Sequence, residues 1–114
     1  MTQIAPMLAV TEGNAAVEVY ENALGAKLLW KLGEKEVVAG LSIGGAKFFL
    51  AHEAPEYRTR GPSSAGFTTV RVELFVDDPV AVQQKALAAG AVEHSPVTED
   101  RFDMEGPQPI RRML

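Results

Sequence analysis

Aliphatic side chains recur at every second position of the segment Thr69–Val76. They are Val70, Val72, Leu74 and Val76. Successive side chains of a strand point to opposite faces, so this alternation predicts a half-buried strand. Asp78 and Pro79 follow, a pair typical of a helix start, because aspartate caps free N–H groups and proline fits the first turn. The pattern therefore predicts a helix over Pro79–Ala89, ended by Gly90.

The same order of strand, helix and glycine stop occurs once earlier in the chain. A strand is expected at Gln3–Val10 and a helix at Asn14–Leu24, which Gly25 ends. Val76 lies 66 positions after Val10, and the two glycine stops are 65 positions apart. A repeat this long, present twice, does not indicate a solenoid of short units. It predicts one domain made of two similar modules.

Three further strands complete the first module in this interpretation. They are Lys27–Leu32, Val37–Ile43 and Ala46–His52. By alternation, Leu28, Trp30 and Leu32 share one face of the first of them. Gly44 and Gly45 separate the last two strands, and both positions tolerate a positive φ. A two-residue hairpin turn is expected there.

Proline, glycine and serine concentrate between residues 54 and 66, which predicts a linker. We expect a single domain over residues 1–114, with module one at 1–53 and module two at 67–114. In module two, a strand is expected at Ala91–Val97 and a polar loop at Glu99–Gln108, and Ile110–Leu114 is compatible with another strand. By the offset of 66, the counterpart of the strand that begins at Ala46 would begin at residue 112. The second module is therefore expected to be incomplete.

Composition and charge exclude several classes of protein. The 114 residues carry a formal net charge of −4 and include no cysteine. An acidic balance disfavours nucleic acid as a partner, because phosphate contacts require clustered lysine and arginine. Without cysteine there is neither a disulfide framework nor a thiolate metal site. No apolar run is long enough for a membrane span and no signal peptide pattern is present, so we expect a cytoplasmic protein without a membrane partner.

Three runs of the sequence resemble a known superfamily. They are MLAVTEGNAAVEVYENALGAKLLWKL, GLSIGGAKFFLAHE and TTVRVELFVDDPVAVQQKALAAGAVEHSPV. They are similar to the vicinal oxygen chelate superfamily, in particular to its glyoxalase/bleomycin-resistance/dioxygenase group and its small bacterial PhnB-like members. The resemblance implies an α+β fold of two βαβββ modules whose mixed sheet forms a cup. Helices would cover the outside, and a ligand would bind inside.

Alternation combined with this resemblance selects five residues for the inside of the cup. They are Met7, Phe49, Arg71, Glu73 and Phe75. Arg71 and Glu73 are two positions apart on one strand face, roughly 6–7 Å between Cα atoms. Two interpretations of this pair stay open. Arg71 either receives an anionic group of a ligand that Glu73 helps to orient, or the two residues form an internal ion pair or bind a cross-strand partner and only satisfy each other.

Enzymes of the superfamily bind a divalent metal, and the resemblance places three of the metal positions in this chain. They correspond to Ala5, Phe49 and Arg71. A methyl, a phenyl and a guanidinium group offer no lone pair to a metal. His52 and His94 do not replace them, because they lie far apart in sequence without a metal-ligand spacing. We therefore expect neither a metal nor another cofactor.

The expected function is metal-free binding of a small organic molecule in the cup. One alternative is a metal-dependent lyase, isomerase or dioxygenase of the same superfamily, so whether the protein is an enzyme stays open. Another is an interaction module without a ligand, whose cup is filled by its own side chains. Because an incomplete second module would expose strand edges and apolar surface, a homodimer is also expected.

Overall fold

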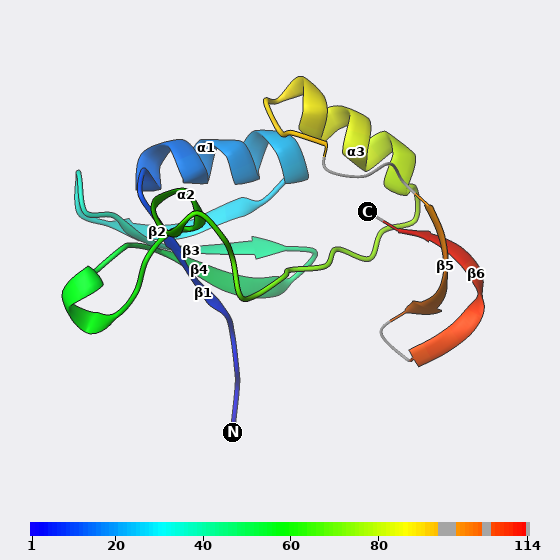
Figure 1. Ribbon diagram of the computed structural model, residues 1–114, viewed down its shortest axis with the longest axis horizontal. Helices are drawn as coiled ribbons and strands as arrows, with labels where there is room; N and C mark the ends of the chain where they lie inside the picture. The colour runs from blue at the N-terminus through cyan, green and yellow to red at the C-terminus, as the bar shows by residue number, and fades with distance from the viewer. Residues whose placement is uncertain (94–97, 104–105, 114) are drawn as a thin grey trace.

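A computed structural model describes residues 1–93, 98–103 and 106–113 of the chain, with side chains up to Glu93. Its main part is a four-stranded sheet with the order β1-β4-β3-β2 (Figure 1). The strands are β1 (Met7–Val10), β2 (Lys27–Leu32), β3 (Val38–Ile43) and β4 (Ala46–His52). β1 is parallel to β4, and the other neighbours are antiparallel. With the helix between β1 and β2, this is the βαβββ module expected for residues 1–53.

The hydrophobic core of this module lies between the sheet and helix α1 (Gly13–Leu24). It comprises Val17, Ala26, Val37, Ala39, Leu41 and Leu50. Leu41 and Leu50, from neighbouring central strands, are 0% exposed. Gly25 ends the helix with a φ of +67°, a conformation that glycine adopts without steric cost. The α+β arrangement of one helix on one face of a mixed sheet confirms the expected fold class.

The expected hairpin turn between β3 and β4 is confirmed, since φ is +56° at Gly44 and +84° at Gly45. β1 is shorter than predicted and begins only after Pro6. Proline has no N–H to donate to a ladder, although its carbonyl oxygen accepts a hydrogen bond of 2.9 Å from the Phe49 N–H. β1 forms an edge of the sheet, as the position of Pro6 indicates.

The linker is folded rather than extended, and it packs beside β1. It contains the 3-10 helix η1 (Pro55–Tyr57) and the short helix α2 (Pro62–Ala65). Gly61 N–H donates a hydrogen bond of 2.9 Å to Glu53 Oε1. A Cβ at Gly61 would lie 3.2 Å from the Cα of Val10, so the linker touches the carboxyl end of β1.

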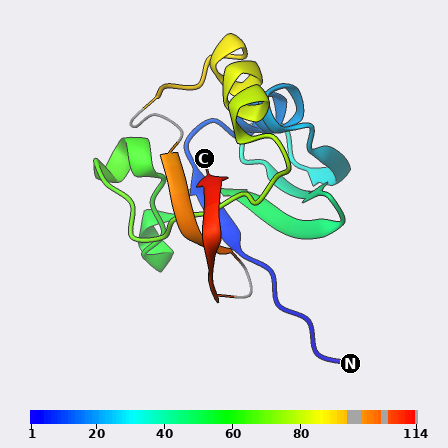
Figure 2. The ribbon, with the colours of Figure 1, turned by 90° about the vertical axis from the view of Figure 1, so that its right-hand side faces the viewer.

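The second module begins with helix α3 (Pro79–Ala88), which lies beside α1 (Figure 1). Asp78 caps it as expected, because its Oδ1 accepts a hydrogen bond of 3.1 Å from the Ala81 N–H. β5 (Thr98–Asp103) and β6 (Gly106–Met113) then form a separate antiparallel ribbon (Figure 2). Within the described residues, two strands follow α3, where a complete βαβββ module has three.

The predicted strand Thr69–Val76 is wrong, since its residues belong to neither described sheet. Val70 and Val72 are 60% and 62% exposed, and only Leu74 and Val76 of the aliphatic face are half-buried. Alternation fixes which side chains share a face, but a strand also needs a partner. The nearest open edge belongs to β1, where Pro6 offers no N–H and the linker already packs against Val10.

The predictions for the end of the chain are also corrected. Residues 91–93 form no strand, and 94–97 and His94 lie outside the described residues. The expected polar loop Glu99–Gln108 is instead largely β5 and the start of β6. Pro107 is typical of a loop, but both strands of a two-stranded ribbon are edges, where proline is tolerated. β6 includes most of Ile110–Leu114, the last stretch compatible with a strand.

Candidate ligand-binding face

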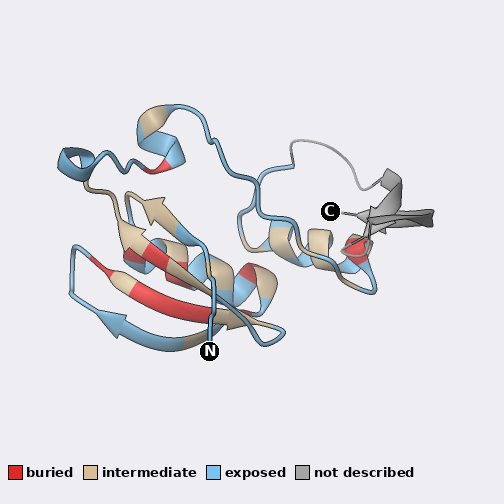
Figure 3. Ribbon diagram, turned by 90° about the horizontal axis from the view of Figure 1, so that it is seen from below, coloured by how far each residue is buried: buried red, intermediate tan, exposed pale blue. Residues whose placement is uncertain are grey.

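The sheet has one face that α1 does not cover, which we call the open face (Figure 3). Alternation with the core residues assigns its members. They are Met7 and Ala9 of β1, Lys27, Trp30 and Leu32 of β2, Val38, Gly40 and Ser42 of β3, and Lys47, Phe49 and Ala51 of β4. Met7 is 61% exposed, Trp30 41% and Leu32 65%. The open face therefore presents large apolar side chains to solvent.

Four of these residues, one from each strand, form a line across the sheet that we call the aromatic row. They are Met7, Phe49, Gly40 and Trp30. Their backbone positions are in register, Met7 with Phe49, Phe49 with Gly40, and Gly40 with Trp30. The ring centroids of Trp30 and Phe49 are 5.8 Å apart, and the ring planes are inclined by 38°. This separation lies in the range of favourable aromatic pairs. The indole and the phenyl group therefore make one continuous aromatic surface.

Gly40 makes this pairing geometrically possible. A Cβ built on it would lie 2.5 Å from Nε1 and 2.6 Å from Cε2 of Trp30. The indole therefore lies directly over the backbone of β3, and it reaches Phe49 on the strand beyond. Any larger residue at this position would occupy the space of the indole.

A β-bulge in β2 directs Trp30 to the open face. Leu28 pairs with Leu41 and Trp30 pairs with Gly40, so Leu29 is an extra residue on β2. Leu28 packs against the core, whereas Trp30 and Leu32 lie on the opposite face. The prediction that Leu28, Trp30 and Leu32 share a face is therefore wrong for Leu28. Strict alternation contains no signal for a bulge, and this is why Trp30 is not among the expected site residues.

Of the five residues expected inside the cup, the structure brings two together. Met7 and Phe49 are neighbours in the aromatic row. Arg71 is exposed, with 84% of its side chain accessible, and its Nη2 lies 3.9 Å from Glu73 Oε1. The pair is therefore at the surface, and the interpretation as an internal ion pair is wrong. Phe75, 38% exposed, belongs to the same irregular segment.

Glu73 borders a small apolar cavity of about 280 Å³ on the α1 side of the sheet. Tyr20 of α1 and Phe48 of β4 line the same cavity, with ring centroids 5.1 Å apart. Burial raises the pKa of the Tyr20 phenol, since the ionised form would lose hydration. This cavity and the aromatic row lie on opposite faces of the sheet.

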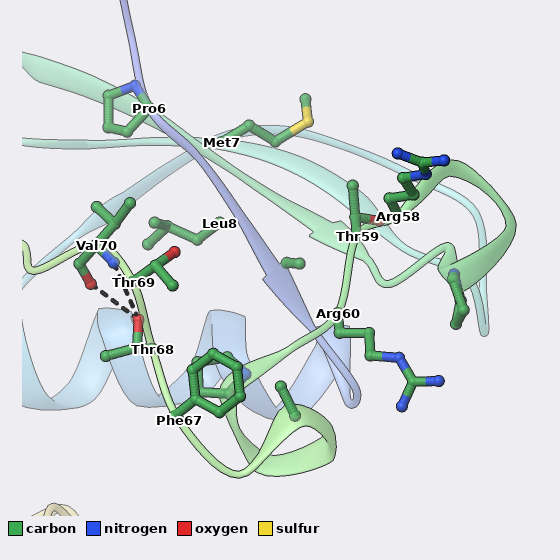
Figure 4. Close-up of a pocket in the computed structure, with 14 residues that line it drawn as sticks. Pro6, Met7, Leu8, Arg58, Thr59, Arg60, Phe67, Thr68, Thr69 and Val70 are labelled. Atoms are coloured by element: carbon green, nitrogen blue, oxygen red, sulfur yellow. Dashed lines mark hydrogen bonds between the residues drawn. The ribbon is translucent and has the colours of Figure 1, made fainter.

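Two larger hollows border the part of the aromatic row that Met7 and Phe49 form. One, of about 730 Å³, lies between β1, the linker and residues 67–70, and Met7 lines it. The second, of about 550 Å³, includes Phe49 and Lys47 in its lining. In Figure 4 the guanidinium groups of Arg58 and Arg60 point away from the space between β1 and Val70. Both hollows have the size of small-molecule sites.

The residues at the superfamily's metal positions do not fit a metal. Phe49 packs against Trp30, Arg71 is exposed, and Ala5 lines the hollow beside Phe49. In the described part of the chain, no three His, Cys, Asp or Glu residues gather closely enough to hold an ion. His52 has a buried Nδ1 without a hydrogen-bond partner, but alternation along β4 turns it to the α1 side. It does not contribute to the open face.

The βαβββ topology and the open aromatic face define an α+β protein with a single open four-stranded mixed sheet, of which β5 and β6 are not part. The chain matches the model of the Glyoxalase/Bleomycin resistance protein/Dioxygenase superfamily over residues 2–106, and it belongs to this superfamily. The expected resemblance is confirmed at this level. A search of curated proteins found no significant match.

Two solved structures share the fold. The gene product At5g48480 of Arabidopsis thaliana superposes with a TM-score of 0.60 at 22% identity, over 92% of this chain and 79% of that chain. The protein SMU.1112c superposes with a TM-score of 0.53 at 16% identity, over 92% of this chain and 84% of that chain. At these identities the likeness concerns the fold alone. Among the described residues, no helix has the length and apolar character that crossing a bilayer requires.

Proposed function

We propose that this protein binds a small organic molecule through a planar aromatic group, without a metal, on the open face. The observation that carries the proposal is the position of Trp30 over Gly40 and beside Phe49. Indole and phenyl rings stack favourably on planar ligands, and a mostly apolar lining is typical of small-molecule sites. Met7 extends the surface with a flexible thioether that adapts to different ligand shapes.

The two alternatives have less support. A metal-dependent lyase, isomerase or dioxygenase would need ligands that Ala5, Phe49 and Arg71 do not supply. An interaction module would fill the open face with its own side chains, whereas Trp30 and Met7 stay accessible. The likeness to PhnB-like proteins and the cytoplasmic location stay predictions.

Quenching of tryptophan fluorescence tests the proposed function, because Trp30 is the single tryptophan of the chain. We expect planar aromatic compounds to quench its emission with a saturable dependence on concentration. Phe49→Ala removes one of the two rings and should weaken binding by about three- to tenfold, the value of one aromatic contact.

Leu32→Ala is the matched control, since Leu32 is on the open face and 65% exposed but lies outside the aromatic row. The affinity of the Leu32→Ala variant for planar aromatic compounds should stay close to that of the unchanged protein. Absence of saturable quenching by any planar compound would contradict the proposed function.

We also propose that the protein is a homodimer. Val70 and Val72 are largely exposed on a segment that belongs to neither described sheet. Exposed apolar side chains that lie close together favour association with another chain. Sedimentation at low micromolar concentration should therefore show a dimer, and Val72→Lys should shift it towards the monomer. Val92→Lys, at a position 77% exposed, is the control and should leave the dimer intact. A monomer for the unchanged protein would contradict this proposal.

A further inference from the structure

The charged side chains on the four-stranded sheet are all of one sign. Within β1, β2, β3 and β4, all of which the structure describes, there are three lysines and no acidic residue. The whole chain, in contrast, has 15 acidic residues against 11 basic ones. The four strands of this sheet therefore carry a net positive charge, although the chain as a whole is acidic.

Two of these lysines belong to the open face and the third does not. Lys27 pairs with Ser42, and Ser42 pairs with Lys47, so the three residues form a second line across the sheet. We call it the cationic row. Lys31 lies on the α1 side, where its Nζ donates a hydrogen bond of 2.9 Å to Asn14 Oδ1.

Both lysines of the cationic row are exposed, and neither forms a described ion pair, since the described pair is Arg71 with Glu73. Their strands are separated only by β3, so their Cα atoms are roughly 10 Å apart. Two flexible lysine side chains can converge over that distance. The Ser42 hydroxyl lies between them and adds a donor for an oxyanion.

The cationic row runs parallel to the aromatic row. Lys47 and Phe49 are two positions apart on β4, as are Ser42 and Gly40 on β3, which sets the rows roughly 6–7 Å apart. A ring stacked on Trp30 and Phe49 would therefore hold a carboxylate on a short arm within reach of both lysines. The opposite side of the aromatic row offers only Leu32, Val38, Ala51 and Ala9.

We infer that the ligand of the open face is an aromatic carboxylate, whose ring stacks on the aromatic row and whose carboxylate binds the cationic row. This inference rests on the proposed function and adds the chemical class of the ligand. It assigns a polar end to a surface whose other residues are apolar.

The test compares two compounds with the same ring, 4-nitrophenylacetic acid and 4-nitrophenylacetamide, by quenching of Trp30 emission at low salt. The acid, ionised at neutral pH, should bind about fivefold more tightly than the neutral amide, which is the upper value for an exposed ion pair. High salt should remove most of this difference, because exposed charges are screened.

Lys27→Gln and Lys47→Gln should each weaken binding of the acid by up to about fivefold and leave the amide unchanged. Lys31→Gln changes the net charge equally but acts on the other face, and it should leave both affinities unchanged. Equal binding of acid and amide by all variants would overturn the inference while the proposed function stands. Failure of both compounds to quench would count against the proposed function as well.

A second copy of the chain is the competing occupant of the open face. In that case Trp30 emission would shift to shorter wavelength as the protein concentration rises, and neither compound would bind to the associated form. This outcome would overturn the inference.

Discussion

Leu41→Ala should lower the free energy of unfolding by about 2–5 kcal/mol, the range for truncating a leucine inside a core. Leu41 is on a central strand, is 0% exposed, and belongs to the core cluster beneath α1. Truncation removes buried apolar surface and leaves a cavity that a close-packed interior fills only in part. Chemical denaturation followed by circular dichroism measures the loss.

Leu32→Ala provides the comparison at an exposed position of the same sheet. Its side chain is on the open face, so the cost should be within about 0.5 kcal/mol. Equal losses for the two variants would show that the core does not lie on the α1 side of the sheet.

Gly40→Ala should have the largest effect on ligand binding. The new methyl group would occupy the position of the Trp30 indole, which has to leave the surface of β3. We expect a loss of stability of about 1–3 kcal/mol from overpacking and a loss of affinity of about tenfold or more, because the contact with Phe49 is broken. The emission of Trp30 should also shift to longer wavelength as the indole becomes more exposed.

Val38→Ala is the matched change for Gly40→Ala, since Val38 is on the same strand and the same face. It lies beside Leu32 and not beneath the indole, so the emission of Trp30 should keep its wavelength. An unchanged emission spectrum and affinity for Gly40→Ala would show that Trp30 does not depend on the glycine.

Most of the first module follows from local sequence signals. The ranges of β2 and β4 agree with the prediction, and the positions of Gly25 and Gly44-Gly45 agree with their positive φ angles. These features depend on side-chain period and on the conformational freedom of glycine, both of which act within a few residues. The order β1-β4-β3-β2 of the strands within the sheet is not among the predictions, because no local pattern contains it.

The segment Thr69–Val76 shows that a local pattern does not predict strand pairing. Its alternation is as regular as that of any strand in the chain, yet it has no partner strand in the described part of the structure. Strand pairing is a contact between distant segments, so the pattern of one segment cannot establish it. Arg71, Glu73 and Phe75 are in the expected site only because Thr69–Val76 is predicted to be a strand. The structure therefore offers no shared face that joins them to Met7 and Phe49.

The candidate site is predictable only in part for a similar reason. Met7 and Phe49 follow from alternation on regular strands, whereas Trp30 requires knowledge of the bulge. The partner of the indole, Gly40, carries no sequence signal beyond being a glycine inside a strand, a feature that often marks a close approach of another group.

The bulge at Leu29 also determines where strand β2 can lose a residue. Leu29 is 41% exposed and has no opposite residue on β3. If a deletion removed it, Lys27, Leu28, Trp30, Lys31 and Leu32 would form a regular strand in which each residue keeps its present face. A deletion at Lys31 instead would turn Leu32 towards the core and disrupt the pairing with Val38. A single-residue deletion should therefore be tolerated in β2 at Leu29 and not at Lys31, and relatives with a shorter β2 should lack this residue.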